Sequence, residues 1–214
     1  MNPSIVSSVI AQNQFELDEI LDKLRGYLTT IQLDFMDGQF VPGTSLLFSL
    51  KLSPFFDYEA HLMVNDPIKW VETIPKVIPK IIVHFESLND DASILHKIKS
   101  KGKRVFLALN PNTSSTVVDP LIDLIDGIMV MTVEPGRYGA PFLPEMLKKV
   151  EKIRAKYEDI EIEADGGMNP VTSRLAINAG VNIIASGSFL IKSSNIEKAM
   201  KELKNAVSHK EKSK

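Results

Sequence analysis

The chain of 214 residues contains no cysteine. This absence excludes disulfide bonds, thiolate metal sites and cysteine nucleophiles, and it is compatible with a reducing compartment. The net charge is −2, so there is no basic field that would attract nucleic acid or an anionic membrane. No apolar run approaches the roughly 20 residues that span a bilayer, and the start MNPSIVSSVI lacks the charged region of a signal peptide. We therefore expect a soluble, cytoplasmic protein with no nucleic-acid or membrane partner.

Short segments rich in β-branched residues alternate along the chain with amphipathic segments of helical period. One apolar stripe at helical spacing consists of Phe15, Leu17, Ile20, Leu21 and Leu24. Such alternation indicates βαβ units and a parallel sheet, and eight units in about 210 residues favour a single closed (β/α)₈ barrel over an open doubly wound sheet. The barrel is expected over residues 1–208, followed by a frayed charged tail at 209–214. The predicted strands are Ser4–Val9, Thr30–Phe35, Tyr58–Met63, Lys80–Phe85, Arg104–Leu109, Gly127–Val133, Glu161–Asp165 and Asn182–Ser186.

Polar residues stand at the ends of several predicted strands, where a barrel of this kind carries its chemistry. Asp34, His61 and Asp165 end three different strands, and Gln32 shares a face with Asp34 because side chains two apart in a strand point the same way. Two carboxylates and an imidazole at one rim predict a divalent-metal site, to which Gln32 could add an amide oxygen. The carboxylates could also serve as general acid and base. A purely structural role for Asp34, as a loop cap or lysine partner, is the alternative.

A Gly-Gly pair and a Gly-Ser pair follow the last two predicted strands. Gly166 and Gly167 follow the seventh strand, and Gly187 and Ser188 follow the eighth. Glycine lets backbone N–H groups approach an anion, and these two loops commonly bind phosphate in such barrels. The four residues therefore predict a phosphate site, with ordinary turn chemistry as the alternative. At the end of the fourth strand, His84 either lines the pocket or is buried for structural reasons.

Seven motifs in order cover nearly the whole chain: PSIVS (3–7), LDFMDGQFVP (33–42), HLMV (61–64), VHFE (83–86), LNP (109–111), VMTVEPG (130–136) and EADGG (163–167). Together they resemble the ribulose-phosphate 3-epimerase family, whose members are phosphate-binding barrels that invert C3 of a ketopentose phosphate. The resemblance implies an isomerase of the pentose phosphate pathway. It would convert D-ribulose 5-phosphate into D-xylulose 5-phosphate through a metal-stabilised enediolate, without a redox cofactor, and the protein is expected to form a homo-oligomer.

The resemblance also implies roles for individual residues. Asp34 and Asp165 would be the proton-transfer pair. One divalent ion, expected to be Zn, Mn or Fe, would be held by Asp34, His61 and Asp165, with Gln32 at the remaining position. The implied substrate-binding residues are Ser7, Met36, His61, Met63, Met131, Gly136 and Gly139. Phosphate would be bound by Gly166, Gly167, Gly187 and Ser188.

Two departures from the family pattern bear on the activity. Gln32 stands where most members have histidine, and because a neutral amide is a poorer ligand, we expect the metal to be weakly held. The loop Pro135-Gly136-Arg137-Tyr138-Gly139-Ala140 differs from the usual Pro-Gly-Phe-Gly-Gly-Gln. Tyr138 replaces a glycine of close phosphate approach, although Arg137 could supply a charge instead.

Three other functions stay open at this point. An epimerase of a hexulose phosphate, such as allulose 6-phosphate, is favoured by segments 130–135 and 141–147. A decarboxylase or aldolase on the same barrel, such as a 3-keto-gulonate 6-phosphate decarboxylase, is disfavoured, because segment 61–66 lacks the lysine of the Asp-x-Lys-x-x-Asp motif of those decarboxylases. A non-catalytic phosphate-binding barrel that has lost its metal through Gln32 is the third, since fold alone does not imply function.

Overall fold

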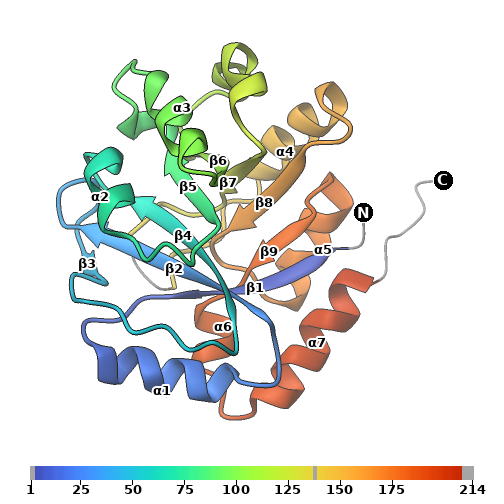
Figure 1. Cartoon of the computed structure of the whole chain (residues 1–214). Coiled ribbons are helices and arrows are strands. Elements are labelled where there is room, and N and C mark those ends of the chain that lie inside the picture. Colours follow the sequence, from blue (N-terminus) through green and yellow to red (C-terminus); the bar gives the residue numbers. More distant parts are fainter. Residues whose placement is uncertain (1–2, 137–138, 209–214) are drawn as a thin grey trace.

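The computed structural model describes residues 3–136 and 139–208, so the expectations for Arg137, Tyr138 and the tail 209–214 lie outside the described residues. Eight parallel strands form a closed barrel, in which the first strand, β1, pairs with both β2 and the last strand, β9. Helices surround the strands (Figure 1), and the predicted (β/α)₈ barrel is confirmed. The barrel strands are β1 (Ser4–Val9), β2 (Thr30–Asp37), β4 (Asp57–Met63), β5 (Lys80–His84), β6 (Arg104–Leu109), β7 (Gly127–Met131), β8 (Glu161–Asp165) and β9 (Ile183–Ala185).

Every predicted strand is present, and each of its ends differs from the prediction by at most two residues. A further strand, β3 (Thr44–Ser45), was not predicted. It pairs antiparallel with the end of β2, which brings Met36 opposite Ser45 and turns the loop after β2 back along that strand.

The helical segments between strands are α1 (Gln14–Leu24), α2 (Pro67–Thr73), η1 (Phe85–Ser87), α3 (Ser93–Ser100), η2 (Ser115–Leu124), α4 (Met146–Lys156), α5 (Pro170–Ala179), α6 (Ser188–Ile191) and α7 (Ile196–Ser208). The segment before β7, η2, is a 3₁₀ rather than an α-helix, and it contains Pro120, which has no N–H for a helical hydrogen bond. Within the described part of the chain, no helix is both long enough and apolar enough to cross a membrane.

The predicted apolar stripe of α1 is correct except for Phe15. Leu17, Leu21 and Leu24 are buried against the barrel, whereas Phe15 is 70% exposed. The Asn13 side chain caps the helix by accepting from the Glu16 N–H, so Phe15 lies in the first turn. It precedes Leu17 by only two positions, which places it on a different face of the helix.

Alternation along the strands divides the side chains between the inside and the outside of the barrel. On β2, Ile31, Leu33 and Phe35 join the large cluster that packs beneath the helices. Gln32 and Asp34 point inward, and Asp34 lies level with His61 on β4. The closed sheet therefore collects inward polar side chains from distant parts of the chain into one interior.

Candidate active site

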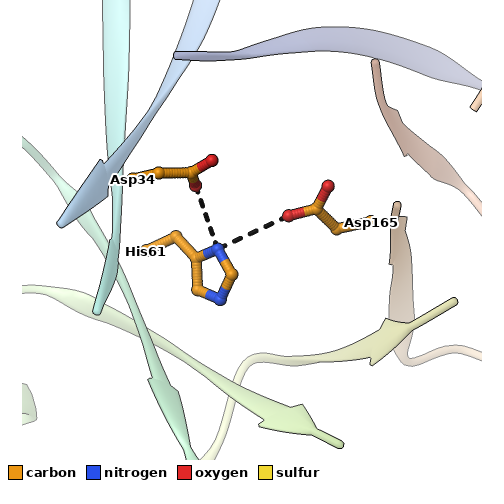
Figure 2. A group of neighbouring side chains, drawn as sticks. All are labelled: Asp34, His61 and Asp165. Carbon is orange, nitrogen blue, oxygen red and sulfur yellow. Dashed lines mark hydrogen bonds and ion pairs between the residues drawn. The ribbon is translucent and has the colours of Figure 1, made fainter. Parts of the chain in front are cut away.

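Asp34, His61 and Asp165 converge inside the barrel (Figure 2). Asp34 and His61 come from neighbouring strands, and Asp165 reaches them from β8. His61 Nδ1 lies 3.0 Å from Asp34 Oδ1 and 3.4 Å from Asp165 Oδ2. One ligand atom from each residue lies within 4.8 Å of the others, and all three residues are buried. The structure thus brings together the three residues that the sequence placed at one rim.

Gln32 occupies the centre of this group. Its Nε2 donates to Asp34 Oδ1 at 2.9 Å and to Asp165 Oδ2 at 2.8 Å, and it lies 3.3 Å from His61 Nδ1. Its Oε1 is buried without a hydrogen-bond partner among the described residues. A half-turn of the amide would exchange the two atoms and turn this oxygen toward the three ligands. Two carboxylates, an imidazole and an amide oxygen form a donor set that fits a divalent ion.

The electrostatics of the group follow from burial and mutual contact. Burial raises the pKa of Asp34, and hydrogen bonds from His61 and Gln32 offset this only in part. Burial by itself would lower the pKa of His61, but its hydrogen bonds and charge interactions with Asp165 and Asp34 outweigh that effect and raise the pKa to about 10. A protonated His61 between two carboxylates therefore offsets part of their negative charge.

A pocket opens directly above this group. Asp34 and Asp165 lie in its wall, together with most of the residues that the sequence assigned to substrate and phosphate. Those assigned residues are Met63, Met131, Gly136, Gly139, Gly166, Gly167, Gly187 and Ser188. The two carboxylates and the glycine turns after β8 and β9 consequently face one space.

Three predicted substrate contacts lie elsewhere. Ser7 pairs with Ile31 and faces outward, whereas Ser8 pairs with inward-facing Gln32 and lines the pocket. The structure therefore places Ser8, and not Ser7, at the pocket wall. Met36 packs behind that wall against Val41 and Met63. His61 is fully buried below the wall.

The turn after β8 needs its glycines for reasons of backbone and packing. Gly166 and Gly167 have φ values of 116° and 65°, in the left-handed region. A Cβ on Gly166 would lie 2.4 Å from Val133 Cγ2. Thr132, a residue that sequence reasoning gave no role, shares its single hydroxyl proton between the carbonyls of Asp165 and Gly166, at 2.9 and 2.6 Å. These contacts hold Asp165 and the glycine turn in fixed relation.

His84 is fully buried behind His61, which decides between the two roles left open by the sequence. The two Nε2 atoms are 2.9 Å apart, and the rings are stacked with centroids 5.0 Å apart. Burial lowers the pKa of His84 to about 4, although Glu86 partly offsets the effect. His84 is therefore a neutral neighbour of the site that does not line the pocket.

The chain matches the sequence model of the "Ribulose-phosphate 3 epimerase family" over residues 1–191. It belongs to this family. The relative named "Ribulose-phosphate 3-epimerase, cytoplasmic isoform" from Oryza sativa subsp. japonica is 34% identical, over 96% of this chain and 92% of its own length. "Ribulose-phosphate 3-epimerase" from Bacillus subtilis (strain 168) is 31% identical, over 95% and 97% of the two chains. Family membership agrees with the pocket, where two carboxylates meet the glycine turns.

Solved structures of lower identity share the fold. KGPDC from Streptococcus mutans superposes with a TM-score of 0.69 at 12% identity, over 97% of this chain and 98% of that one. The 3-hexulose-6-phosphate synthase from Salmonella typhimurium gives 0.68 at 12% identity, over 95% and 98%. At these identities the likeness establishes the barrel and not the reaction.

Proposed function

We propose that this member of the ribulose-phosphate 3-epimerase family is an isomerase that interconverts D-ribulose 5-phosphate and D-xylulose 5-phosphate. One observation carries the proposal: Asp34 and Asp165, from β2 and β8, open into the same pocket as the glycine turns after β8 and β9. Relatives that bear the name of this activity align with nearly the whole chain. Among the pocket residues that the structure describes, none specifically favours a hexulose phosphate.

Asp34 and Asp165 supply the proton transfers. Epimerisation at C3 requires a proton to leave one face of the carbon and another to arrive on the opposite face. The two carboxylates stand on different strands with the pocket above them, so each can serve one face of a substrate held between them. Burial raises the pKa of Asp34, which makes its carboxylate a stronger base than one in water.

A divalent ion would be held by Asp34, His61 and Asp165, with Gln32 Oε1 as a further donor. The fit rests on the three converging ligand atoms and on the partnerless buried oxygen of Gln32. When bound, the ion supplies positive charge beside the oxygens at C2 and C3, where negative charge develops. We expect the ion to be Zn, Mn or Fe.

The remaining pocket residues position the substrate and exclude water. Met63 and Met131 line the pocket with soft apolar surface, and Met36 packs behind Met63. Such walls limit the access of water to a reactive enediolate. Backbone N–H groups of the turns at Gly166–Gly167 and Gly187–Ser188 would bind the phosphate.

The decisive experiment follows D-ribulose 5-phosphate in D₂O by NMR, with metal-stripped protein and with added Zn, Mn or Fe. We expect xylulose 5-phosphate that carries deuterium at C3, because the returning proton comes from a carboxyl that exchanges with solvent. Allulose 6-phosphate in a parallel sample tests the hexulose alternative. No turnover of either sugar phosphate with any of the metals would favour a non-catalytic barrel.

We further propose that the barrel spans residues 1–208 as one unit, that the protein forms a homo-oligomer, and that it works in the cytoplasm. The last point is supported by the rice relative, which is named as a cytoplasmic isoform. Light scattering coupled to size-exclusion chromatography would test the oligomer, and a monomer at micromolar concentration would contradict it.

A further inference from the structure

His61 is held from both sides by hydrogen-bonding groups. Its Nδ1 faces the carboxylates of Asp34 and Asp165, and its Nε2 lies 2.9 Å from His84 Nε2. At that distance one nitrogen must carry the proton and the other must offer a lone pair. Neither imidazole is exposed, so no water competes for the contact.

The charge of Glu86 favours one direction for this contact. Glu86 Oε2 lies 3.4 Å from His84 Nδ1, within ion-pair distance, and no hydrogen bond joins these two atoms. A carboxylate beside Nδ1 favours the tautomer of His84 that carries its proton there, and this tautomer presents a lone pair at Nε2. His61 then donates from Nε2. When its Nδ1 gives up the proton that it holds against Asp34, the Nδ1 lone pair is left for a ligand on the carboxylate side. From the Asp34–Asp165 pair to Glu86, each imidazole therefore directs its N–H toward the next group in the same direction.

The far end of the chain of contacts is anchored to the loop after β6. Glu86 Oε1 accepts from the Asn110 N–H at 3.0 Å and from the Thr113 hydroxyl. Lys149 Nζ steadies the same loop by donating to the Asn110 carbonyl at 2.7 Å. The carboxylate that orients His84 is therefore itself held in place.

Phe40 covers the His84 ring from the loop after β2, with centroids 4.8 Å apart. That loop is itself shaped by Asp37 Oδ1, which accepts from the Gln39 and Phe40 N–H groups at 2.8 and 2.9 Å. His84 is thus fixed in orientation by polar contacts on one side and an aromatic ring on the other.

We propose that His84 is a positioning residue that holds the proton of His61 on Nε2 and thereby keeps His61 Nδ1 available as a metal ligand. The inference rests on the proposed metal site and extends it to a residue outside the pocket. Partners that orient a ligating histidine typically change metal affinity by about 10–100-fold when they are removed. His84 touches neither substrate nor the ligand atoms, so its effect should appear in metal affinity first.

The test measures zinc and manganese dissociation constants by competition with a chromophoric chelator. His84→Phe keeps a planar ring against Phe40 but removes the acceptor, and we expect affinity to fall at least tenfold. His84→Gln places an amide oxygen near the lost Nε2 and should recover most of that loss. If His84→Phe folds and binds both metals within twofold of the wild type, the positioning role is wrong. If the wild type binds no metal, the proposed metal site fails instead.

A second measurement needs no variant. Nitrogen-15 NMR of the histidine rings in the zinc-loaded wild type reports which nitrogen carries each proton. We expect the Nε2–H form for His61 and the Nδ1–H form for His84. The reverse pattern at either ring would overturn the proposal even if His84→Phe failed to fold.

Discussion

Two groups of buried ionisable side chains are stacked inside this barrel, and only one of them opens into the pocket. The upper group is Asp34, His61 and Asp165. The lower group is Glu59, Lys80 and Glu163, in which Lys80 Nζ lies 2.9 Å from Glu59 Oε2 and 2.6 Å from Glu163 Oε2. Glu59 and Glu163 precede His61 and Asp165 by two positions and so face the same interior one layer down. Each group combines two carboxylates with one nitrogen base.

The two groups differ in their nitrogen base, which is lysine in the lower group and histidine in the upper group. This difference makes the lower group structural and leaves the upper group able to take part in catalysis. Burial alone would lower the pKa of Lys80, but the charges of Glu163 and Glu59 outweigh it and raise the pKa. The ammonium therefore stays between the carboxylates, above the Phe106 ring at 3.7 Å from its centroid. A histidine in the upper group can give up its Nδ1 proton and offer a lone pair. A lysine between two carboxylates thus occupies the place of a cation with its own charge. A histidine in that place can lose its proton, so the two carboxylates remain able to bind a cation.

The largest expected effect comes from removing one upper carboxylate. Asp34→Asn or Asp165→Asn should lower kcat by roughly a thousandfold or more, because acid–base catalysis contributes about 10²–10⁴-fold and the metal ligands are damaged as well. Glu163→Gln is the matched control in the lower group and should retain most activity. Retention of more than about a tenth of wild-type turnover by either Asn variant would contradict the two-carboxylate mechanism.

Removing the lower nitrogen base should affect stability more than catalysis. Lys80→Met leaves Glu59 and Glu163 buried without their counter-charge, and breaking such a buried pair costs about 3–5 kcal/mol. Urea unfolding would measure the loss. The triple variant Glu59→Gln, Lys80→Met, Glu163→Gln should recover much of it, and equal instability of the triple and single variants would argue against an electrostatic cause.

Gln32→His should strengthen the upper site. Imidazole is a better ligand than an amide for zinc or manganese, so we expect affinity to rise by about tenfold without loss of activity. Calorimetric titration of both proteins with each metal checks this. Unchanged or weaker binding by the variant would mean that residue 32 does not reach the ion.

The smallest expected effect is a pH dependence of stability that arises from Glu163. Burial, followed by the charge of Glu59, raises its pKa well above the ordinary 4.5. A carboxyl group whose pKa is raised in the folded protein makes its full contribution to the free energy of unfolding below about pH 4.5. This contribution is lost as the pH rises through the pKa of the folded protein. Glu163→Gln should therefore flatten part of the decline in unfolding free energy above pH 4.5. Parallel pH profiles of the two proteins would contradict the assignment.

Sequence reasoning reached the strands and the three upper residues because both depend on local rules. Strand periodicity identified which side chains share a face, and the barrel rule placed Asp34, His61 and Asp165 at one rim. It missed Ser8 because Ser7 was assigned through the family resemblance alone, whereas the register of β1 against β2 sets Ser8 level with inward-facing Gln32.

The lower group was beyond the reach of sequence patterns. Lys80 begins β5 and Glu59 lies near the start of β4, positions that on an open sheet would be read as solvated ends. Only closure of the barrel brings Glu163 across to meet them. The hydrogen bond from Gln32 to Asp165 was missed for the same reason, since it joins two strands that are far apart in the sequence.

The buried amide of Gln32 also has an evolutionary meaning. Glutamine and histidine codons differ only in their third base, so a single nucleotide exchange converts one side chain into the other. The amide already fills the space between the three ligands, where an imidazole of similar size would sit. A single mutation could therefore change the metal affinity of the site in this lineage without altering the barrel.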